Sequence, residues 1–231
     1  WPTGTLLSRL FPEDAPEVLG ERPLAFGCSC SQARVEAMLD ALPEGALLLL
    51  DEAYADFLPS EALPRIAADD PRALRFRTFS KAYGLAGARI GYAIGAPDVI
   101  AAFDKVRNHY GINRVGQIGA LAAVQDQRYL QEAVGKIAAA RERLGSIARA
   151  CGLVPLPSGA NFVTIDCGGD GAFARAVLDA LLGRDVFARK PGVAPLDRCI
   201  RVSCGRDEDL DVFARVLPEA LEAARLGAGR S

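Results

Sequence analysis

The spacing of hydrophobic positions changes along the chain and predicts where its helices and strands lie. Residues 31–42 carry apolar side chains every three or four positions, which predicts a helix that ends at Pro43. The apolar run 46–50, with Asp51 directly after it, predicts a fully buried strand, because strands covered on both faces are apolar throughout. Residues 1–30 contain four prolines and several glycines, so we expect loop and short turns there.

Strand and helix patterns then alternate as far as residue 151. Residues 73–80 alternate in the manner of a strand, and residues 87–95 are small and apolar enough for a second strand after a tight turn. We expect a helix to start within 97–108 and a buried helix at 115–125. Residues 129–151 place apolar side chains on one stripe with Arg and Glu opposite, which predicts a long amphipathic helix able to bridge two domains.

The remainder of the chain predicts a smaller unit of mixed helices and strands. The expected elements are, in order, a strand at 161–166, a helix at 171–182, a short strand near Val186, a strand at 199–204 and a final helix at 207–226. We therefore expect an α/β chain with an irregular N-terminal segment (1–44), a partial large domain (45–130) and a small α+β C-terminal domain (131–231).

Composition and charge narrow the kinds of partner. The 27 basic and 29 acidic residues are interspersed and leave a net charge of −2, which gives no continuous surface for nucleic acid or an anionic membrane. The longest apolar run is far shorter than the roughly 20 residues that span a bilayer, and the N-terminus lacks a signal-peptide pattern, so we expect a cytoplasmic protein. The partners that we expect are small molecules and copies of the same chain. The six scattered cysteines are typical of reduced thiols.

Residues 77–95, RTFSKAYGLAGARIGYAIG, concentrate candidate chemistry in one turn. Lys81 stands among small and hydroxyl residues, where loss of hydration frees its amine to attack a carbonyl and form a Schiff base. Arg89, together with the hydroxyls of Thr78 and Ser80, can present several donors to one phosphate. Pyridoxal phosphate carries both an aldehyde and a phosphate. The alternative interpretation of Lys81 is an ordinary solvated lysine.

The end of the first predicted strand supplies a third element of this hypothesis. A buried carboxylate at Asp51 needs a cationic partner, and the protonated ring nitrogen of pyridoxal phosphate is one. Tyr54, three residues later, can reach the phenolic oxygen of the same ring. The alternative interpretation of Asp51 is a helix N-cap or a turn residue.

Five motifs together resemble a known family. They are DEAYADF, RTFSKAYGLAGARIGYAIG, KVRNHYGINRVGQ, PSGANFVTIDCG and IRVSCG, in the order found in fold-type-I pyridoxal-phosphate aminotransferases, and the chain is similar to the histidinol-phosphate aminotransferase type from about residue 40 onwards. The resemblance implies the C-terminal part of the family's large domain, a mostly parallel sheet with helices, followed by a smaller α+β domain. It also implies a homodimer that catalyses transamination between an amino acid and a 2-oxo acid or a phosphorylated ketone, in histidine or aromatic amino-acid biosynthesis.

The same resemblance implies roles for individual residues around the cofactor ring. Lys81 resembles the lysine that carries the cofactor as a Schiff base and moves the proton at the α-carbon of the substrate. Asp51 resembles the partner of the pyridine nitrogen, and Tyr54 resembles the partner of the phenolic oxygen. No metal ion is implied.

The resemblance also implies roles for residues that bind the phosphate of the cofactor and the carboxylate of the substrate. The residues that resemble the phosphate ligands are Thr78, Ser80 and Arg89. Arg201 of IRVSCG resembles the residue that binds the α-carboxylate of the substrate through its two-pronged guanidinium group. The alternative interpretation of Arg201 is a surface arginine on a strand, and Asn161 is expected near it without an assigned role.

One segment departs from this family. Residues 10–36 resemble a short piece of the redox-switched heat-shock chaperone of the thirty-three-kilodalton class, in which a C-x-C and a later C-x-x-C bind zinc. Cys28 and Cys30 match the first pair, but the sequence has no C-x-x-C, so we expect no such zinc site. Trp1 stands where the family has the asparagine of NPTGT, so we expect upstream cofactor contacts to be missing. A second interpretation is therefore a truncated or hybrid fragment without catalysis, at most an interaction module.

Overall fold

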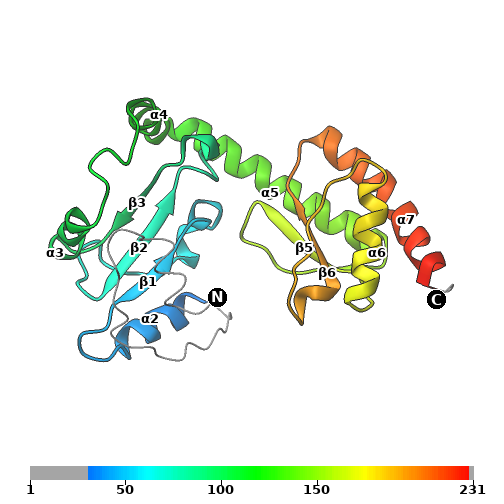
Figure 1. Ribbon diagram of the computed structural model, residues 1–231, viewed down its shortest axis with the longest axis horizontal. Coiled ribbons are helices and arrows are strands. Elements are labelled where there is room, and N and C mark those ends of the chain that lie inside the picture. The colour runs from blue at the N-terminus through cyan, green and yellow to red at the C-terminus, as the bar shows by residue number, and fades with distance from the viewer. Residues whose placement is uncertain (1–30, 229–231) are drawn as a thin grey trace. The chain divides into compact units, whose positions relative to one another are not determined.

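The computed structural model describes residues 31–228 (Figure 1). The described residues from Gln32 onwards belong to one compact unit. The loop predicted for residues 1–30 and the Cys28–Cys30 pair lie outside the described residues. The chaperone resemblance of residues 10–36 falls mostly outside them too, and it remains a prediction.

A three-stranded sheet, in the order β1-β2-β3, occupies the first part of the described chain. Strands β1 (Leu48–Asp51) and β2 (Ala73–Thr78) are parallel, with Asp51 opposite Phe76. Strand β3 (Gly91–Ile94) is antiparallel to β2, with Gly91 opposite Thr78. The three strands predicted from the sequence are confirmed, and one of the two pairings is parallel.

One face of this sheet packs on helix α2 (Gln32–Asp40), which confirms the helix predicted at 31–42. Leu39 of α2 packs with Leu48, Ile66 and Ala73 in a small buried cluster. Figure 1 shows α2 beside β1. The opposite face of β1 is different, because Leu49 is 62% exposed and Asp51 is exposed as well.

The prediction that β1 is fully buried was therefore wrong. Within the described residues only the face with Leu48 is packed, so burial follows the two-residue period of a strand covered on one side. The apolar residues at 47–50 had suggested cover on both faces.

The segments after β3 are helical but shorter or more exposed than expected. Helix α3 (Pro97–Ala101) continues into a 3₁₀ turn at Ala102–Lys105, where the sequence predicted a helix start. Helix α4 (Arg114–Gln125) is not the buried helix that its apolar residues suggested, since Val115 is 81% exposed. The small residues of α4 face inward instead, and Ala120 packs with Phe79, Tyr83 and Ile90.

Helix α5 (Gln127–Ala150) confirms the long amphipathic helix. The side chain of Asp126 accepts a hydrogen bond from the amide of Tyr129 and caps the helix. Leu144 and Ala148, on the predicted stripe, are completely buried. The helix crosses the expected domain boundary at residues 130/131, and the boundaries at 44/45 and 130/131 remain predictions.

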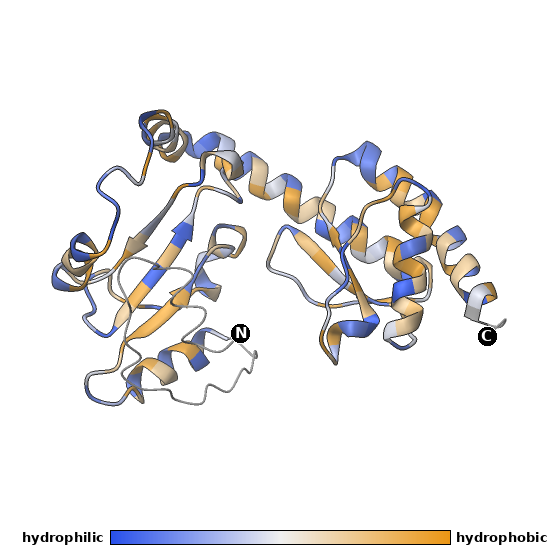
Figure 2. Cartoon of the chain, viewed as in Figure 1, coloured by the Kyte–Doolittle hydropathy of each residue, from blue (hydrophilic) through white to orange (hydrophobic). Residues whose placement is uncertain are grey.

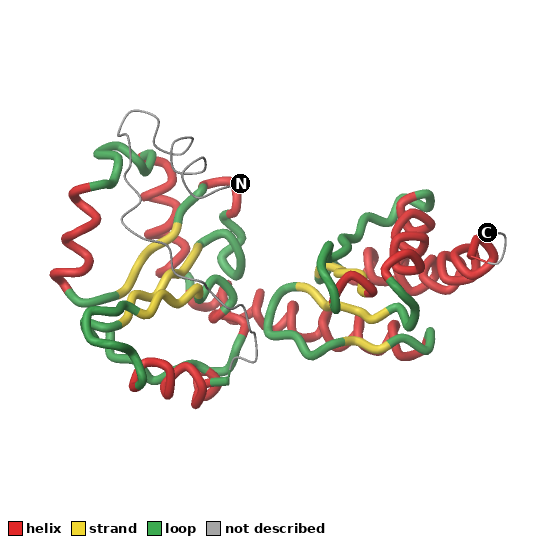
Figure 3. The backbone as a smooth tube through the Cα atoms, turned by 60° about the horizontal axis from the view of Figure 1, so that its bottom comes forward, coloured by secondary structure: helices red, strands yellow, loops and turns green. Residues whose placement is uncertain are grey.

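A second sheet, in the order β4-β5-β6, holds the largest core of the described residues. The strands β4 (Val154–Pro155), β5 (Phe162–Asp166) and β6 (Cys199–Ser203) are antiparallel, and helices α6 (Gly171–Leu182) and α7 (Asp207–Ala228) pack against them with α5. Figure 2 shows hydrophobic residues along β5 and on the neighbouring helices, and Figure 3 shows the strands of both sheets in yellow. Core side chains with no exposed surface include Leu144, Ile165, Val177, Ile200 and Leu217.

The short strand predicted near Val186 is not present in the described chain. An isolated bridge joins Arg189 to Arg201 instead, through a hydrogen bond from the Arg189 amide to the Arg201 carbonyl at 3.0 Å. The pairing is too short for a strand because the Arg189 segment meets β6 at this one residue.

Candidate functional site

The first sheet brings the predicted cofactor residues to one edge. Asp51 ends β1 and Thr78 ends β2, and parallel strands have their carboxyl ends at the same edge. Gly91, the first residue of β3, lies opposite Thr78. Tyr54 follows β1, and the connection that carries Ser80, Lys81 and Arg89 leaves and re-enters the sheet at this edge. Ligand sites of open α/β sheets are commonly found at this position.

Lys81 is held in a tight turn directly after β2. The amide of Gly84 donates to the carbonyl of Lys81 at 3.0 Å, and Gly84 adopts φ +72°, a conformation that favours glycine. The amide of Leu85 donates to the carbonyl of Phe79, whose ring is buried against Tyr83. The backbone at Lys81 is therefore anchored by a buried aromatic residue on one side and a glycine turn on the other.

The side chain of Lys81 faces an aromatic ring. Its Nζ lies 5.3 Å from the centre of the Tyr54 ring, and the Tyr54 ring meets that of Phe162 edge-on at 5.7 Å. The guanidinium carbon of Arg201 lies 4.7 Å from the centre of the Phe162 ring. Two aromatic rings thus separate a cationic amine from a guanidinium group, each cation within the range of a cation–π contact.

These four side chains line a pocket of about 210 Å³. The other lining residues are Asn161, Phe187, Ala188, Arg189 and Ser203. The structure therefore brings together Lys81, Tyr54 and Arg201, which the sequence predicted as site residues, and it places Asn161 beside them as expected.

Asp51 differs from the expectation of a buried carboxylate. Its side chain is exposed, and Oδ1 accepts a hydrogen bond from the amide of Ala53 at 2.9 Å, which is the geometry of a turn residue. The burial was wrongly predicted because the face of β1 that carries Leu49 and Asp51 is not covered within the described residues. Its assignment as partner of a ring nitrogen remains a prediction.

The three predicted phosphate ligands lie at the same edge but already have local contacts. The hydroxyl of Thr78 donates to the carbonyl of Ile90 at 3.3 Å and accepts from the amide of Ser80 at 3.0 Å. Arg89 adopts φ 55°, and its Nη1 donates to the carbonyl of Ala86 at 2.9 Å. These contacts shape the turn that carries Lys81, and the phosphate role of the three residues remains a prediction.

A buried group of charges beneath this edge was missed at the level of sequence. Glu52 is only 8% exposed, and its two carboxylate oxygens accept hydrogen bonds from Nε of Arg75 and Nε of Arg77, both at 2.9 Å. Arg77 also reaches Asp56, with Nη1 3.5 Å from Oδ1. The available signal was the spacing of Arg75 and Arg77, which puts two arginines on one face of a strand.

The pKa values in this group reflect burial and pairing. Burial opposes the charge on Arg77, but the hydrogen bond to Glu52 and the attraction of that carboxylate outweigh it, so the pKa of Arg77 is raised. Burial raises the pKa of Asp56, and the attraction of Arg77 lowers it by a smaller amount. The pairing with Glu52 therefore stabilises the charged form of Arg77, whereas burial disfavours the charged form of Asp56.

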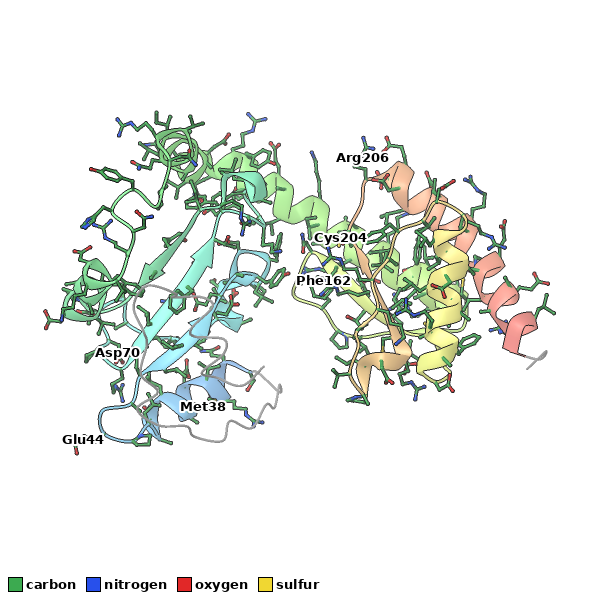
Figure 4. All side chains as sticks on the ribbon, in the orientation of Figure 1. Met38, Glu44, Asp70, Phe162, Cys204 and Arg206 are labelled. Carbon is green, nitrogen blue, oxygen red and sulfur yellow. The ribbon has the colours of Figure 1, made fainter. Side chains whose placement is uncertain are left out.

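A larger pocket of about 780 Å³ also opens beside Lys81. Its lining combines cationic and acidic side chains from α5, the residue before α7 and the start of α7, among them Lys136, Arg143, Arg206, Asp207 and Glu208. Cys204 lines it as well, and burial raises the pKa of this thiol to about 11. Figure 4 shows Phe162 and Cys204 on adjacent segments, in keeping with the hydrogen bond from the Cys204 amide to the Asn161 carbonyl at 2.9 Å.

Arg189 is a second site residue that the sequence reasoning missed. Its bridge to Arg201 puts two arginines side by side in the pocket that Lys81 lines. Sequence periodicity gave no signal for it, because the contact comes from a loop that touches β6 at one residue.

Two negative findings concern the described residues 31–228. No cluster of three or more His, Cys, Asp or Glu side chains within them has the arrangement of a metal site. None of the helices in that range combines the length and apolar character needed to cross a bilayer.

Comparison with known proteins places these motifs among related chains. The family described as Aminotransferase class I and II matches residues 26–217, a span that contains every candidate site residue named above. "Histidinol-phosphate aminotransferase 1" of Nitrosococcus oceani is 38% identical over 194 residues, which cover 83% of this chain and 52% of that protein. "Histidinol-phosphate aminotransferase" of Moorella thermoacetica is 32% identical over 199 residues, which cover 84% and 51%.

A solved structure of a related aminotransferase has a similar fold. It is the crystal structure of histidinol-phosphate aminotransferase from Sinorhizobium meliloti in complex with pyridoxal-5'-phosphate. The sequence identity is 52% and the TM-score is 0.80, over 84% of this chain and 53% of that one. The chain thus spans about half the length of the relatives that it matches.

Proposed function

Because the chain belongs to the class I and II aminotransferases, we propose that it binds pyridoxal phosphate at Lys81 and takes part in amino-group transfer between an amino acid and an oxo compound. The observation that carries this proposal is the shared pocket of Lys81 and Arg201, which are 120 positions apart in the sequence and lie on either side of Tyr54 and Phe162. An amine and a guanidinium group in one small pocket suit an aldehyde cofactor and a carboxylate substrate.

The residues present fit the cofactor by the chemistry of their donors. Lys81 offers an amine for the aldehyde, and the hydroxyl and guanidinium groups for a phosphate are those of Thr78, Ser80 and Arg89 at the same sheet edge. Asp51, exposed at the same edge, is the carboxylate proposed for the ring nitrogen. When bound, the cofactor supplies an aldehyde that condenses with amines and a ring that withdraws electrons from the substrate's α-carbon.

The protein's own residues then select and orient the substrate. Arg201 binds the α-carboxylate with two parallel hydrogen bonds, and the Phe162 ring beneath the guanidinium restricts the orientation of that fork. The amine of Lys81 takes and returns the proton at the substrate's α-carbon. The ring of Tyr54 lies between Lys81 and Phe162 and holds the amine on one side of it.

The pocket presents two guanidinium groups to the substrates. Arg189 and Arg201 line it together, and the geometry of a guanidinium fork matches both carboxylate and phosphate. We propose a phosphorylated ketone as the acceptor, in keeping with the names of the relatives. An aromatic 2-oxo acid, whose anionic group is a carboxylate, is the alternative acceptor.

A fragment without catalysis is the second candidate, and the position of Asp51 is the observation that favours it. The carboxylate of Asp51 is engaged by the Ala53 amide and does not line the pocket of about 210 Å³ with Lys81. In that case the described fold acts at most as an interaction module.

We also propose that the folded chain forms a homodimer. Apolar side chains that are more than half exposed on α4, namely Val115, Ile118 and Leu121, offer a surface for it. Sedimentation equilibrium over a range of concentrations distinguishes a dimer from a monomer, and a monomer at the highest concentration contradicts the proposal.

Selective reduction tests the proposed cofactor site. The chain is incubated with pyridoxal phosphate, treated with borohydride and digested, and the modified lysines are identified by mass spectrometry. Only four lysines are possible acceptors, so Lys105, Lys136 and Lys190 serve as internal controls for Lys81. We expect the adduct on Lys81 alone and its loss in Lys81→Ala. An even distribution over the four lysines would refute specific binding.

A half-reaction separates the enzyme from the fragment. If the chain is catalytic, addition of an amino acid to the loaded protein converts the cofactor to its amine form, with the loss of the visible absorption band. A chain that forms the Lys81 adduct but shows no conversion with any amino acid supports the non-catalytic interpretation.

A further inference from the structure

Arg77 contacts the acidic residues on both sides of Tyr54. Its Nε donates to Oε2 of Glu52 at 2.9 Å, and its Nη1 lies 3.5 Å from Oδ1 of Asp56. Glu52 and Asp56 stand two positions before and two positions after Tyr54 in the sequence. A single guanidinium group therefore holds both ends of the short segment that carries the Tyr54 ring.

The backbone of this segment is attached to the same strand. The amide of Glu52 donates to the carbonyl of Phe76 at 2.8 Å, which extends the pairing of β1 with β2 by one residue. Beyond Glu52 the chain turns, with the Ala55 amide bonded to the Glu52 carbonyl and the Phe57 amide bonded to the Tyr54 carbonyl. The side chain of Arg77 then ties the far end of this turn, at Asp56, to β2.

Arg77 also stands close to Lys81 along the chain. It is the penultimate residue of β2, and Lys81 follows four residues later in the turn that Gly84 closes. Tyr54 and Lys81 come from two different loops. Arg77 contacts the acidic residues of the loop that carries Tyr54, and it lies on the strand that continues into the loop that carries Lys81. Arg77 therefore links the loop that carries Tyr54 to the strand from which the loop of Lys81 leaves.

The contacts of Arg77 are shielded from water. The side chains of Arg77, Glu52 and Asp56 are 18%, 7% and 10% exposed. Ion pairs at such low exposure are not screened as surface pairs are, and removal of one partner leaves an uncompensated buried charge. The planar guanidinium fork can bond two carboxylates at once in fixed directions, which the ammonium of a lysine cannot do with the same geometry.

We propose that Arg77 is a positioning residue that holds the Tyr54 ring against the amine of Lys81. The purpose of this contact rests on the proposed function, because the reactive amine of a Schiff-base lysine must be kept in one orientation. The contact itself exists without cofactor, so it can be measured independently of any activity.

Arg75 provides a matched control. It bonds the other oxygen of Glu52, also through Nε at 2.9 Å, and its side chain is similarly shielded, at 13% exposed. Its second contact is the carbonyl of Ile66, whereas the second contact of Arg77 is Asp56. If the arginines only neutralise Glu52, their variants should behave alike. If Arg77 positions Tyr54, only its variants should move the ring.

The contact can be read from nuclear magnetic resonance of the lysines. Reductive methylation with ¹³C-formaldehyde labels the lysines, and replacement of each by arginine assigns Lys81 against Lys105, Lys136 and Lys190. The methyl groups on Lys81 lie over the Tyr54 ring and should show a ring-current shift. The Tyr54→Leu variant lacks that ring, so it gives the reference position of the Lys81 resonance when the ring contact is lost. We expect Arg77→Gln to move the Lys81 resonance most of the way to the Tyr54→Leu position.

Arg75→Gln should leave the Lys81 resonance near its wild-type position. The proposal is overturned if Arg77→Gln keeps the wild-type resonance, or if Arg75→Gln shifts it to the same extent. Circular dichroism melting of each variant shows whether it is folded under the conditions of the measurement.

A milder variant covers the case in which Arg77→Gln does not fold. Asp56→Ala removes only the second contact of Arg77 and leaves its bond to Glu52 in place. Burial raises the pKa of Asp56, so the loss of this carboxylate is tolerated more readily than the loss of the arginine. We expect a partial shift of the Lys81 resonance in Asp56→Ala. A wild-type resonance in this variant contradicts the proposal.

Failure of the proposed function gives a different result. If the wild-type chain forms no selective adduct at Lys81 with pyridoxal phosphate, the cofactor site is refuted. The Lys81 resonance measured without cofactor still reports the contact with Tyr54 in that case. Its shift in Arg77→Gln then supports the positioning role of Arg77 without supporting the proposed function.

Discussion

The amine of Lys81 lies over the face of Tyr54, 5.3 Å from the centre of its ring. The two residues come from loops that leave neighbouring parallel strands at the same edge of the sheet. On the far side of Tyr54, its ring meets the ring of Phe162 from the second sheet. The Phe162 ring in turn contacts the guanidinium group of Arg201. The position of this tyrosine therefore bears on both the amine and the guanidinium group of the proposed site.

Replacement of Tyr54 separates the contribution of its ring from that of its hydroxyl. Tyr54→Phe keeps the ring contacts with Lys81 and Phe162, so we expect the stability of the protein to change by less than about 0.5 kcal/mol. If the hydroxyl binds the cofactor, the affinity for pyridoxal phosphate should fall in Tyr54→Phe. Titration by absorption spectroscopy measures the affinity, and an unchanged dissociation constant contradicts the hydroxyl's predicted role.

Tyr54→Leu tests the ring. Loss of the cation–π contact and of the edge-on contact with Phe162 should cost about 1–2 kcal/mol in urea unfolding, since each such contact contributes roughly 0.5–1.5 kcal/mol. Equal stability of the Leu and Phe variants would show that the ring contacts contribute nothing.

The role of Arg201 predicts a loss that depends on the substrate. Arg201→Gln keeps a polar side chain but removes the charged fork, so kcat/KM for an amino acid should fall by about 10- to 100-fold, because a hydrogen bond to a charged group contributes roughly 1.5–3 kcal/mol. Binding of the cofactor at Lys81 should remain. The half-reaction measures the first effect, and borohydride trapping measures the second. A loss of trapping equal to the loss of activity contradicts a role specific to the substrate.

Sequence motifs identified three residues that the fold brings together at the candidate site. Lys81, Tyr54 and Arg201 were assigned from motifs, and the fold brings them to one pocket. The family and the α/β fold implied by those motifs are confirmed by the match over residues 26–217 and by the TM-score of 0.80. Lys81 and Tyr54 meet because a strand end fixes the direction of the residues that follow it, and the roles of the three residues remain predictions.

The parts that the sequence did not predict depend on partners far along the chain. Glu52 looked like a spacer within DEAYADF, and its burial follows from two arginines that stand 23 and 25 positions later. Leu49 and Val115 looked buried because they are apolar, but hydrophobicity does not say which face of a strand or helix is covered. Arg189 joined the site through one bridge, which has no periodic signature.

Two apolar positions, one on a strand of each sheet, should contribute unequally to stability. Ile165 has no exposed surface and belongs to the large cluster around the second sheet, whereas Leu49 on β1 is 62% exposed. Ile165→Ala should therefore cost about 2–5 kcal/mol, through lost burial and a cavity. Leu49→Ala should cost less than about 1 kcal/mol, because most of its surface is already in water. Urea denaturation measures both, and similar costs would contradict the burial seen at these positions.

The buried thiols predict a loss of stability in alkaline solution. Burial raises the pKa of Cys167 and of Cys204 from the ordinary value of 9.0 to about 11. In the unfolded chain these thiols lose their protons first, so the unfolded state is favoured as the pH rises from about 9 to about 11. The stabilising contribution of the neutral thiols is complete below pH 9 and is lost through that window. Urea unfolding of the wild type and of Cys204→Ala between pH 8 and 11 should show a steeper decline in the wild type.

Alkylation gives an independent measurement of the Cys204 thiol. At pH 8 a thiol of pKa 11 is ionised roughly a hundredfold less than one of pKa 9, and the thiolate is the species that reacts. Iodoacetamide should therefore modify Cys204 about a hundredfold more slowly in the folded protein than in urea, even though this residue lines the larger pocket beside Lys81. Peptide mass spectrometry follows the modification of Cys204 and of the buried Cys167 separately. Rapid alkylation of Cys204 at pH 8 in the folded chain would mean that its thiol is more exposed to water than the structure shows, and the alkaline destabilisation should then be smaller as well.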